Sequence, residues 1–149
     1  MHARTAMTRR VLVVPPQLPL DRAWEVMQRH HIRHLPVVQG GSLLGILSDR
    51  DVLVRARLTD DGVITVPGTA VVHAMTPSPA VCEPDQSISS IVRVMTERKI
   101  DAMPVLDARE RLVGLVTSTD LLLLLVEPDA ARPLPFTFTL EEVPQQLSA

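Results

Sequence analysis

The sequence repeats itself, and this internal repeat constrains the fold more than any other feature. Ala6-Met7-Thr8 recurs as Ala74-Met75-Thr76, 68 residues later. Further matches follow in the same order, at this offset or one residue more: Ile32 with Ile100, Pro36-Val37 with Pro104-Val105, Gly45 with Gly114, and Asp51 with Asp120. Composition alone does not produce ordered matches over this distance, so the chain consists of two copies of one unit.

Each copy has the pattern of a strand, a helix, two strands and a second helix. In the first copy we predict a strand at 11–14, a helix at 21–30, strands at 35–38 and 43–47 around a Gly-Gly turn, and a helix from 49 to about 57. In the second we predict a strand near Val81, a helix at 87–98, strands at 103–106 and 112–116, and a helix from about Ser118. This order predicts an α/β fold in which helices cover one side of each sheet. One copy is too small to bury both faces, so we expect the two to pack together.

The predicted domain boundaries follow from the repeat. The first copy spans 1–57, a linker with turns spans 58–70, the second copy spans 71–126, and a Pro-rich tail spans 127–149. Residues 63–66 of the linker could add a short strand. Residues 136–140 alternate apolar and polar side chains, which is typical of an edge strand on this chain or on a partner. A disordered tail is the alternative.

Composition excludes several classes of protein. A net charge of -2 and a pI near 6.2 argue against general nucleic-acid binding. The first 74 residues hold nine Arg against six acidic residues, and all five His, so anion-binding groups are expected there. The single Cys82 cannot form an internal disulfide, and neither a membrane span nor a secretion signal is recognisable. We therefore expect a cytoplasmic protein without a membrane or nucleic-acid partner.

The segments 48–51 and 117–120 each place a hydroxyl residue three positions before an Asp, where a strand turns into a helix. Free backbone N–H groups at such a helix start suit phosphate or sugar oxygens. The same pattern fits a helix capping box, in which the hydroxyl and the carboxylate satisfy backbone N–H groups. A capping box and a ligand site are compatible, so both interpretations stay open.

Taken together, the repeated Met-Thr, the Leu35-Pro36-Val37 and Met103-Pro104-Val105 strands and the duplicated Gly-x-x-Ser/Thr-x-x-Asp motif resemble a tandem pair of CBS domains, or Bateman module. The resemblance covers roughly residues 6 to 126 and looks like a stand-alone member. It implies two β-α-β-β-α repeats packed about a pseudo-twofold axis. It also implies a regulatory module that binds AMP, ADP, ATP or S-adenosylmethionine in clefts between the repeats and signals occupancy to an unidentified effector.

The resemblance implies roles for particular residues. Asp51 and Asp120 would hold the ribose hydroxyls, a task that carboxylate oxygens can perform by accepting two hydrogen bonds. The other implied contacts are Ser48 and Thr117 to ribose or phosphate, Thr8 and Thr76 near the ribose, Leu12, Ile32 and Ile46 around one base, and Ala80, Ile100 and Leu115 around the other.

The residues before the Pro-Val strands differ between the copies. Arg33-His34 in the first copy stands where members of the family often place phosphate-binding groups, and Asp101-Ala102 stands there in the second. Because Arg33, His34 and Arg50 all lie in the first copy, we predict that its site binds phosphate better than the second site does. Alternatively, Arg33 or His34 would serve a ligand that Asp120 holds, and the sequence does not decide between the two.

Other functions are less consistent with the sequence. His30, His31 and His34 lie near a helix end without accompanying carboxylates or Cys, so we expect no metal site. No nucleophile-base pair is recognisable, so we expect neither an enzyme nor a catalytic cofactor. The resemblance also implies a homodimer, with Trp24 and 121–125 as candidate surfaces. The rival hypotheses are a dimerisation or scaffold module without ligand and, less favoured, a small hydrolase or metal-dependent enzyme.

Overall fold

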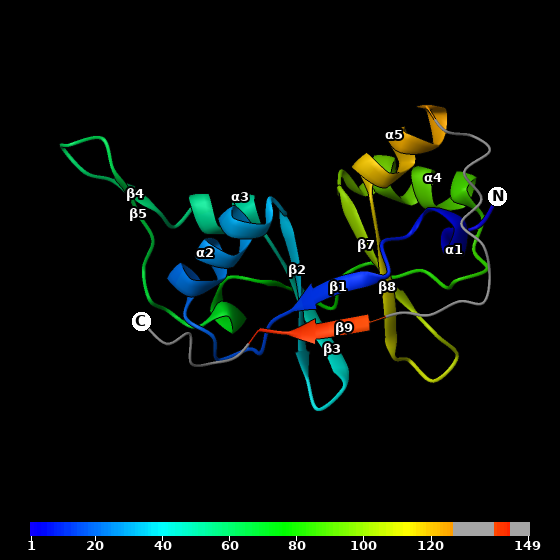
Figure 1. Ribbon diagram of the computed structural model, residues 1–149, viewed down its shortest axis with the longest axis horizontal. Coiled ribbons are helices and arrows are strands. Elements are labelled where there is room, and N and C mark those ends of the chain that lie inside the picture. Colours follow the sequence, from blue (N-terminus) through cyan, green and yellow to red (C-terminus); the bar gives the residue numbers. More distant parts are fainter. Residues whose placement is uncertain (127–138, 144–149) are drawn as a thin grey trace. The chain divides into compact units, whose positions relative to one another are not determined.

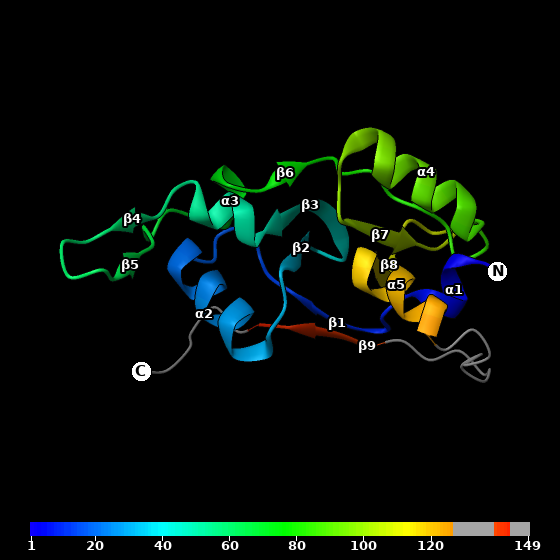
Figure 2. The same cartoon turned by 90° about the horizontal axis from the view of Figure 1, so that it is seen from above.

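A computed structural model describes residues 1–126 and 139–143, and Figures 1 and 2 show it in two views. The elements follow in this order: α1 (Ala3–Ala6), β1 (Arg10–Val13), α2 (Leu20–His30), β2 (His34–Gln39), β3 (Ser42–Ser48), α3 (Asp49–Leu53), β4 (Arg57–Leu58), β5 (Ile64–Thr65), a 3₁₀ turn η1 (Val71–His73), β6 (Thr76–Pro77), α4 (Ile88–Arg98), β7 (Ala102–Leu106), β8 (Leu112–Thr117), α5 (Ser118–Val126) and β9 (Thr139–Glu142).

The chain forms two compact units, named here by the aspartate of the repeated motif. The Asp51 unit contains residues 12–78 with 142–143, and the Asp120 unit contains residues 1–11 with 79–126 and 139–141. The first eleven residues therefore pack with the body of the second repeat, although they precede the first repeat in sequence. Residues 71–78 of the second repeat in turn belong to the Asp51 unit. The two repeats have thus exchanged their opening segments.

A three-stranded antiparallel sheet, ordered β2-β3-β6, forms the framework of the Asp51 unit. The β2-β3 hairpin turns at Gly40 and Gly41, which have φ angles of 56° and 80°, a region that glycine adopts without steric cost. β6 extends the sheet because Ile46 pairs with Thr76. Helices α2 and α3 lie together on one side of the hairpin (Figure 1), as the apolar pattern predicts.

The Asp120 unit repeats this plan with the β7-β8 hairpin, helices α4 and α5, and the opening helix α1. The longer turn of this hairpin is organised by Asp107. Its carboxylate accepts hydrogen bonds from the backbone N–H groups of Arg109 and Arg111, at 2.9 and 3.0 Å, and from the Arg111 guanidinium. These bonds stabilise the hairpin turn, which is one residue longer than its counterpart in the first repeat.

Each unit has its own hydrophobic core. In the Asp51 unit, side chains of α2, β2 and β3 pack around fully buried Leu35 and Leu47, with Trp24 and Ile32 partly buried at the edge. In the Asp120 unit, Ala3 and Met7 of the opening segment are both 0% exposed and pack with Ile91 and Met103. Burial of this apolar surface attaches the opening segment to the second repeat.

Several expectations need correction. Helix α3 ends at Leu53, short of the predicted residue 57. No strand forms near Val81 among the described residues. Only Cys82 makes a bridge there, to Val105. The structure adds α1 and β6, which the sequence did not indicate, whereas the predicted linker strand is present as β5, paired with β4.

The predicted tail strand lies partly outside the described residues, which exclude Phe136 and Phe138. The described part, β9, pairs with β1. Within the Asp120 unit, the Thr139 N–H donates to the Arg9 carbonyl at 3.0 Å, and Arg10 forms an ion pair with Glu141. In the Asp51 unit, the Val143 N–H donates to the Val13 carbonyl at 3.0 Å.

Candidate functional site

The Asp120 motif is a capped helix start with a carboxylate at its centre. One Asp120 oxygen, Oδ2, accepts hydrogen bonds from the Thr117 N–H at 2.8 Å and from the Thr117 hydroxyl at 2.7 Å. The Asp120 N–H is 3.2 Å from the same hydroxyl oxygen. The other carboxylate oxygen, Oδ1, accepts from the Thr8 hydroxyl at 3.2 Å. Two hydroxyls therefore flank a partly buried carboxylate at the N-terminus of α5.

The Asp51 motif has the same capping geometry. The Ser48 N–H donates to Asp51 Oδ2 at 2.8 Å, and the Asp51 N–H donates to the Ser48 hydroxyl at 3.1 Å. The capping boxes predicted from the sequence are thus present in both units. The neighbouring Thr76 is exposed, and its backbone pairs with Ile46.

The structure places each opening threonine beside the motif of the other repeat. Thr8 exchanges two backbone hydrogen bonds with Leu115, at 2.8 and 3.1 Å, next to Asp120. Thr76 lies against Ile46 in the Asp51 unit. The sequence predicted both threonines as site residues but not which motif each would join.

Glycine begins both motifs because the opening segment passes directly over it. A Cβ atom at Gly114 would lie 2.5 Å from the Met7 sulfur, and one at Gly45 would lie 2.6 Å from both the Met75 sulfur and the Thr76 carbonyl oxygen. The repeated Gly and the repeated Met-Thr are therefore two sides of one contact. Sequence analysis found both signals without connecting them.

The remaining predicted apolar residues divide between the units as the sequence grouped them. Leu12 and Ile32 pack at the edge of the Asp51 core, in the unit that also contains Ile46. Ala80 and Ile100 pack at the edge of the Asp120 core, whereas Ala102 and Leu115 are only 6% and 7% exposed. The last two thus have little side-chain surface for a ligand.

Arg33, a predicted phosphate-binding residue of the first repeat, and Asp101 of the second repeat lie at equivalent positions in the two units. The Asp49 N–H, at the start of α3, donates to the Arg33 carbonyl at 2.9 Å. The Ser118 N–H, at the start of α5, donates to the Asp101 carbonyl at the same distance. Beside its capped helix start the Asp51 unit therefore has Arg33, followed by partly buried His34, with exposed Arg50 on α3, whereas the Asp120 unit has Asp101.

Two of the three predicted histidines, His30 and His31, lie at a helix end, whereas His34 begins β2. α2 ends at His30, and His31 follows in the left-handed conformation with φ of 52°. Lys99 has the same conformation, with φ of 54°, after α4. Among the described residues, no group of three or more His, Cys, Asp or Glu could hold a metal ion, and no helix is long and apolar enough to span a membrane.

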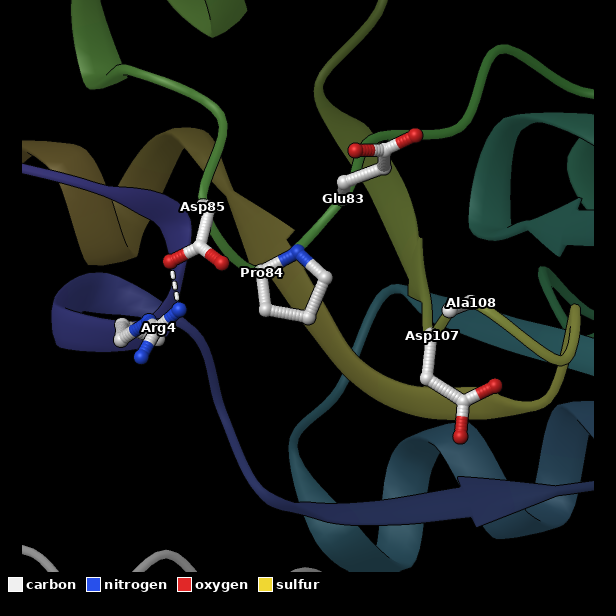
Figure 3. A pocket seen from close by; sticks show the side chains of 6 residues that line it. All are labelled: Arg4, Glu83, Pro84, Asp85, Asp107 and Ala108. Carbon is white, nitrogen blue, oxygen red and sulfur yellow. Dashed lines mark ion pairs between the residues drawn. The ribbon is translucent and has the colours of Figure 1, made fainter.

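A pocket of about 380 Å³ lies elsewhere in the Asp120 unit (Figure 3), and none of the predicted site residues lines it. Three carboxylates face it, from Glu83, Asp85 and Asp107, and Arg4 points toward Asp85, with which it forms an ion pair. Hydrogen bonds from Arg111 hold the pKa of Asp107 at about 2. Since Arg4, the cation that lines the pocket, is already paired with Asp85, the pocket has no group dedicated to an anionic ligand.

Comparisons with known proteins identify the family of the chain. The CBS domain family matches residues 3–57 and again 62–127. The chain is 30% identical over 119 residues to the CBS domain-containing protein YhcV of Bacillus subtilis, covering 79% of this chain and 81% of that protein. It is also 30% identical over 131 residues to an inosine-5'-monophosphate dehydrogenase of Korarchaeum cryptofilum, covering 88% of this chain but only 26% of the enzyme.

Solved structures show the same fold. The CBS-pair protein CBSX2 of Arabidopsis thaliana, determined in complex with AMP, is 26% identical with a TM-score of 0.74, covering 85% of this chain and 97% of that one. The cytosolic domain of the Mg²⁺ channel MgtE, in complex with ATP, is 28% identical with a TM-score of 0.62, covering 78% and 45%. With two family matches that together span most of its length, the chain belongs to the CBS domain family and carries two CBS repeats.

Proposed function

We propose that this protein is a regulatory module that binds an adenosine-containing ligand at its two Ser/Thr-x-x-Asp motifs and passes the occupancy to a partner protein. Relatives with the same fold were solved with AMP and with ATP. Occupancy would act by favouring one of two conformations, and its effect is limited by the difference in ligand affinity between them. No chemical step is required, so the proposed role is regulatory and not enzymatic, with a cytoplasmic location.

The observation that carries this proposal is the Asp120 carboxylate between two hydroxyls. Thr8 occupies one acceptor position of Asp120 Oδ1, and the N–H and hydroxyl of Thr117 occupy two of Oδ2, yet a carboxylate has about four lone-pair sites. Oδ1 can therefore still accept a hydrogen bond from one ribose hydroxyl, and the other ribose hydroxyl can donate to the Thr8 hydroxyl oxygen, which keeps its lone pairs. The apolar side chains of Ala80 and Ile100, in the same unit, would contact the base.

The two sites are proposed to prefer different ligands. In the Asp51 unit, Arg33, His34 and Arg50 accompany the capped helix start, so a phosphate-bearing ligand such as AMP, ADP or ATP is favoured there. At the position of Arg33, the Asp120 unit has Asp101, whose negative charge disfavours phosphate. A cationic adenosyl compound such as S-adenosylmethionine suits that environment better.

A panel of AMP, ADP, ATP and S-adenosylmethionine tests the proposal by thermal unfolding. A ligand that binds only the native protein raises the free energy of unfolding by about 2.7 kcal/mol when its concentration is 100 times its dissociation constant. Asp51→Ala and Asp120→Ala should each remove one part of the shift, measured from the baseline of that variant because each also loses a helix cap. Asp60→Ala, in the exposed turn between β4 and β5, is the matched control and should keep the full shift.

No shift with any of the four compounds at millimolar concentration would reject ligand binding and leave the scaffold hypothesis. A shift that survives both motif substitutions would instead reject the site assignment. Conversion of ATP to a defined product would reject the regulatory role in favour of an enzyme.

Homodimerisation through α5 is part of the same proposal. Leu122, Leu125 and Val126 are 62%, 79% and 75% exposed, and a helix this apolar is unusual on the surface of a monomer. Leu122→Glu with Leu125→Glu should convert a dimer to a monomer in analytical ultracentrifugation. A wild-type protein that still sediments as a monomer at a protein concentration of roughly 100 μM would refute the dimer.

A further inference from the structure

The opening segment, Met1–Thr8, crosses the second repeat and ends on the carboxylate of the Asp120 motif. Its backbone is held at both ends. The Ala3 and Arg4 N–H groups donate to the carbonyls of Gln86 and Pro84, at 2.9 and 3.0 Å, and Thr8 pairs with Leu115. Between these points, helix α1 packs on α5 and β8. In Figure 2, α1 lies beside these two elements.

The same segment supplies part of the Asp120 site. The Thr8 hydroxyl is 3.2 Å from Asp120 Oδ1, although 112 residues separate the two in sequence. The Met7 side chain, next to Thr8, is 0% exposed and occupies the space that the missing side chain of Gly114 leaves open. The position of Thr8 is therefore fixed by the packing of Met7.

Docking of the segment also has an unfavourable component. The Nε atom of Arg4 is buried and has no hydrogen-bond partner among the described residues, and a buried donor without a partner opposes docking. The Arg4–Asp85 ion pair is largely exposed on the Asp85 side, so solvent screens it. These two features offset part of the stabilisation that burial of Ala3 and Met7 gives the docked segment.

We infer that ligand binding at Asp120 and docking of the segment Met1–Thr8 are thermodynamically coupled, so that this segment is the responsive element of the Asp120 site. The inference rests on the proposed function. Thr8 donates to Asp120 and keeps its lone pairs for a ligand hydroxyl, so the docked segment completes the site. Coupling is reciprocal: if docking strengthens ligand binding by some factor, the ligand strengthens docking by the same factor.

Amide hydrogen exchange of the full chain, with and without saturating AMP or S-adenosylmethionine, tests the coupling. We expect the ligand to slow exchange both at 117–120 and at the amides of residues 3–8, by at least about threefold. Protection at 117–120 with unchanged exchange at 3–8 would overturn the inference and leave the proposed function standing. A wild-type protein that binds none of AMP, ADP, ATP and S-adenosylmethionine would overturn the proposed function itself.

Two pairs of variants isolate the contribution of the segment. Thr8→Val, which keeps the side-chain shape but removes the hydroxyl, should weaken binding at Asp120 about tenfold by calorimetry, and Thr8→Ser should restore most of it. Met7→Ala, whose side chain contacts Gly114 and the core, should speed exchange at 3–8 and weaken the same site. Met75→Ala is its matched control in the Asp51 unit and should leave the Asp120 site unchanged.

If Met7→Ala lowers the stability of the whole unit, Thr8→Ser and Thr8→Val still decide the question, because neither removes buried apolar surface of the core. Equal affinity of Thr8→Val and the wild type at the Asp120 site would overturn the inference. Binding that weakens equally in Met7→Ala and Met75→Ala would also overturn it, since the effect would then be general destabilisation.

Discussion

Replacement of Gly45 by alanine tests the packing between the repeated motif and the opening segment. A methyl group at this position would lie 2.6 Å from the Thr76 carbonyl oxygen and from the Met75 sulfur. The carbonyl belongs to the β3-β6 pairing and cannot move without breaking it. We therefore expect Gly45→Ala to destabilise the Asp51 unit by about 3 kcal/mol, at the upper end of the usual cost of overpacking.

Gly114→Ala should destabilise its unit less than Gly45→Ala does. Its nearest neighbour is the flexible end of Met7, and the nearest backbone atom, the Thr8 carbonyl oxygen, lies at 3.1 Å. We expect Gly114→Ala to lower the free energy of unfolding of the Asp120 unit by about 1 kcal/mol. Gly68→Ala is the matched control, since only Asp21 lies within reach, at 3.9 Å, and the φ angle of Gly68 is not positive. It should be neutral or stabilising by up to about 1 kcal/mol.

Urea unfolding, followed by the fluorescence of the single tryptophan, provides the measurement. Trp24 packs at the edge of the Asp51 core and so reports on the unit that contains Gly45. The midpoint should fall in Gly45→Ala while the slope stays constant, because the surface exposed on unfolding does not change. A midpoint equal to that of Gly68→Ala would refute the packing argument.

Two further predictions concern ionisable groups. Burial raises the pKa of the Cys82 thiol to about 12, so at pH 8 a thiol reagent should find roughly a thousandfold less thiolate than in the unfolded chain, and labelling of native protein should follow unfolding. Fast labelling of the native protein would contradict this. Arg111 holds the pKa of Asp107 at about 2, below its ordinary 3.8, so the stabilising effect of this carboxylate is complete above pH 3.8 and disappears as the pH falls through 2. A carboxyl NMR titration should show the low pKa in the wild type and a higher one, still below 3.8, in Arg111→Gln, which keeps the backbone N–H donors at 109 and 111, and an unchanged value in the variant would exclude the Arg111 side chain as a cause.

Local sequence patterns predicted most of the individual elements. Helix α4 begins after Ser87 and ends before Lys99, and the β2-β3 hairpin turns at Gly40-Gly41, close to the predicted positions. These features depend on neighbouring residues and on an apolar period. Predictions were less accurate where tertiary contacts decide, as for the early end of α3 and the absence of a strand near Val81.

The sequence by itself determined that the chain contains two CBS repeats and that each has a capped helix start with a carboxylate, because duplication and capping are both visible in residue order. Only the tertiary structure decided which opening segment joins which motif. The two copies have nearly the same local pattern, so no local signal distinguishes pairing of Thr8 with Asp51 from pairing with Asp120. Packing of Ala3 and Met7 into the second core makes that choice, and it brings Thr8 to Asp120.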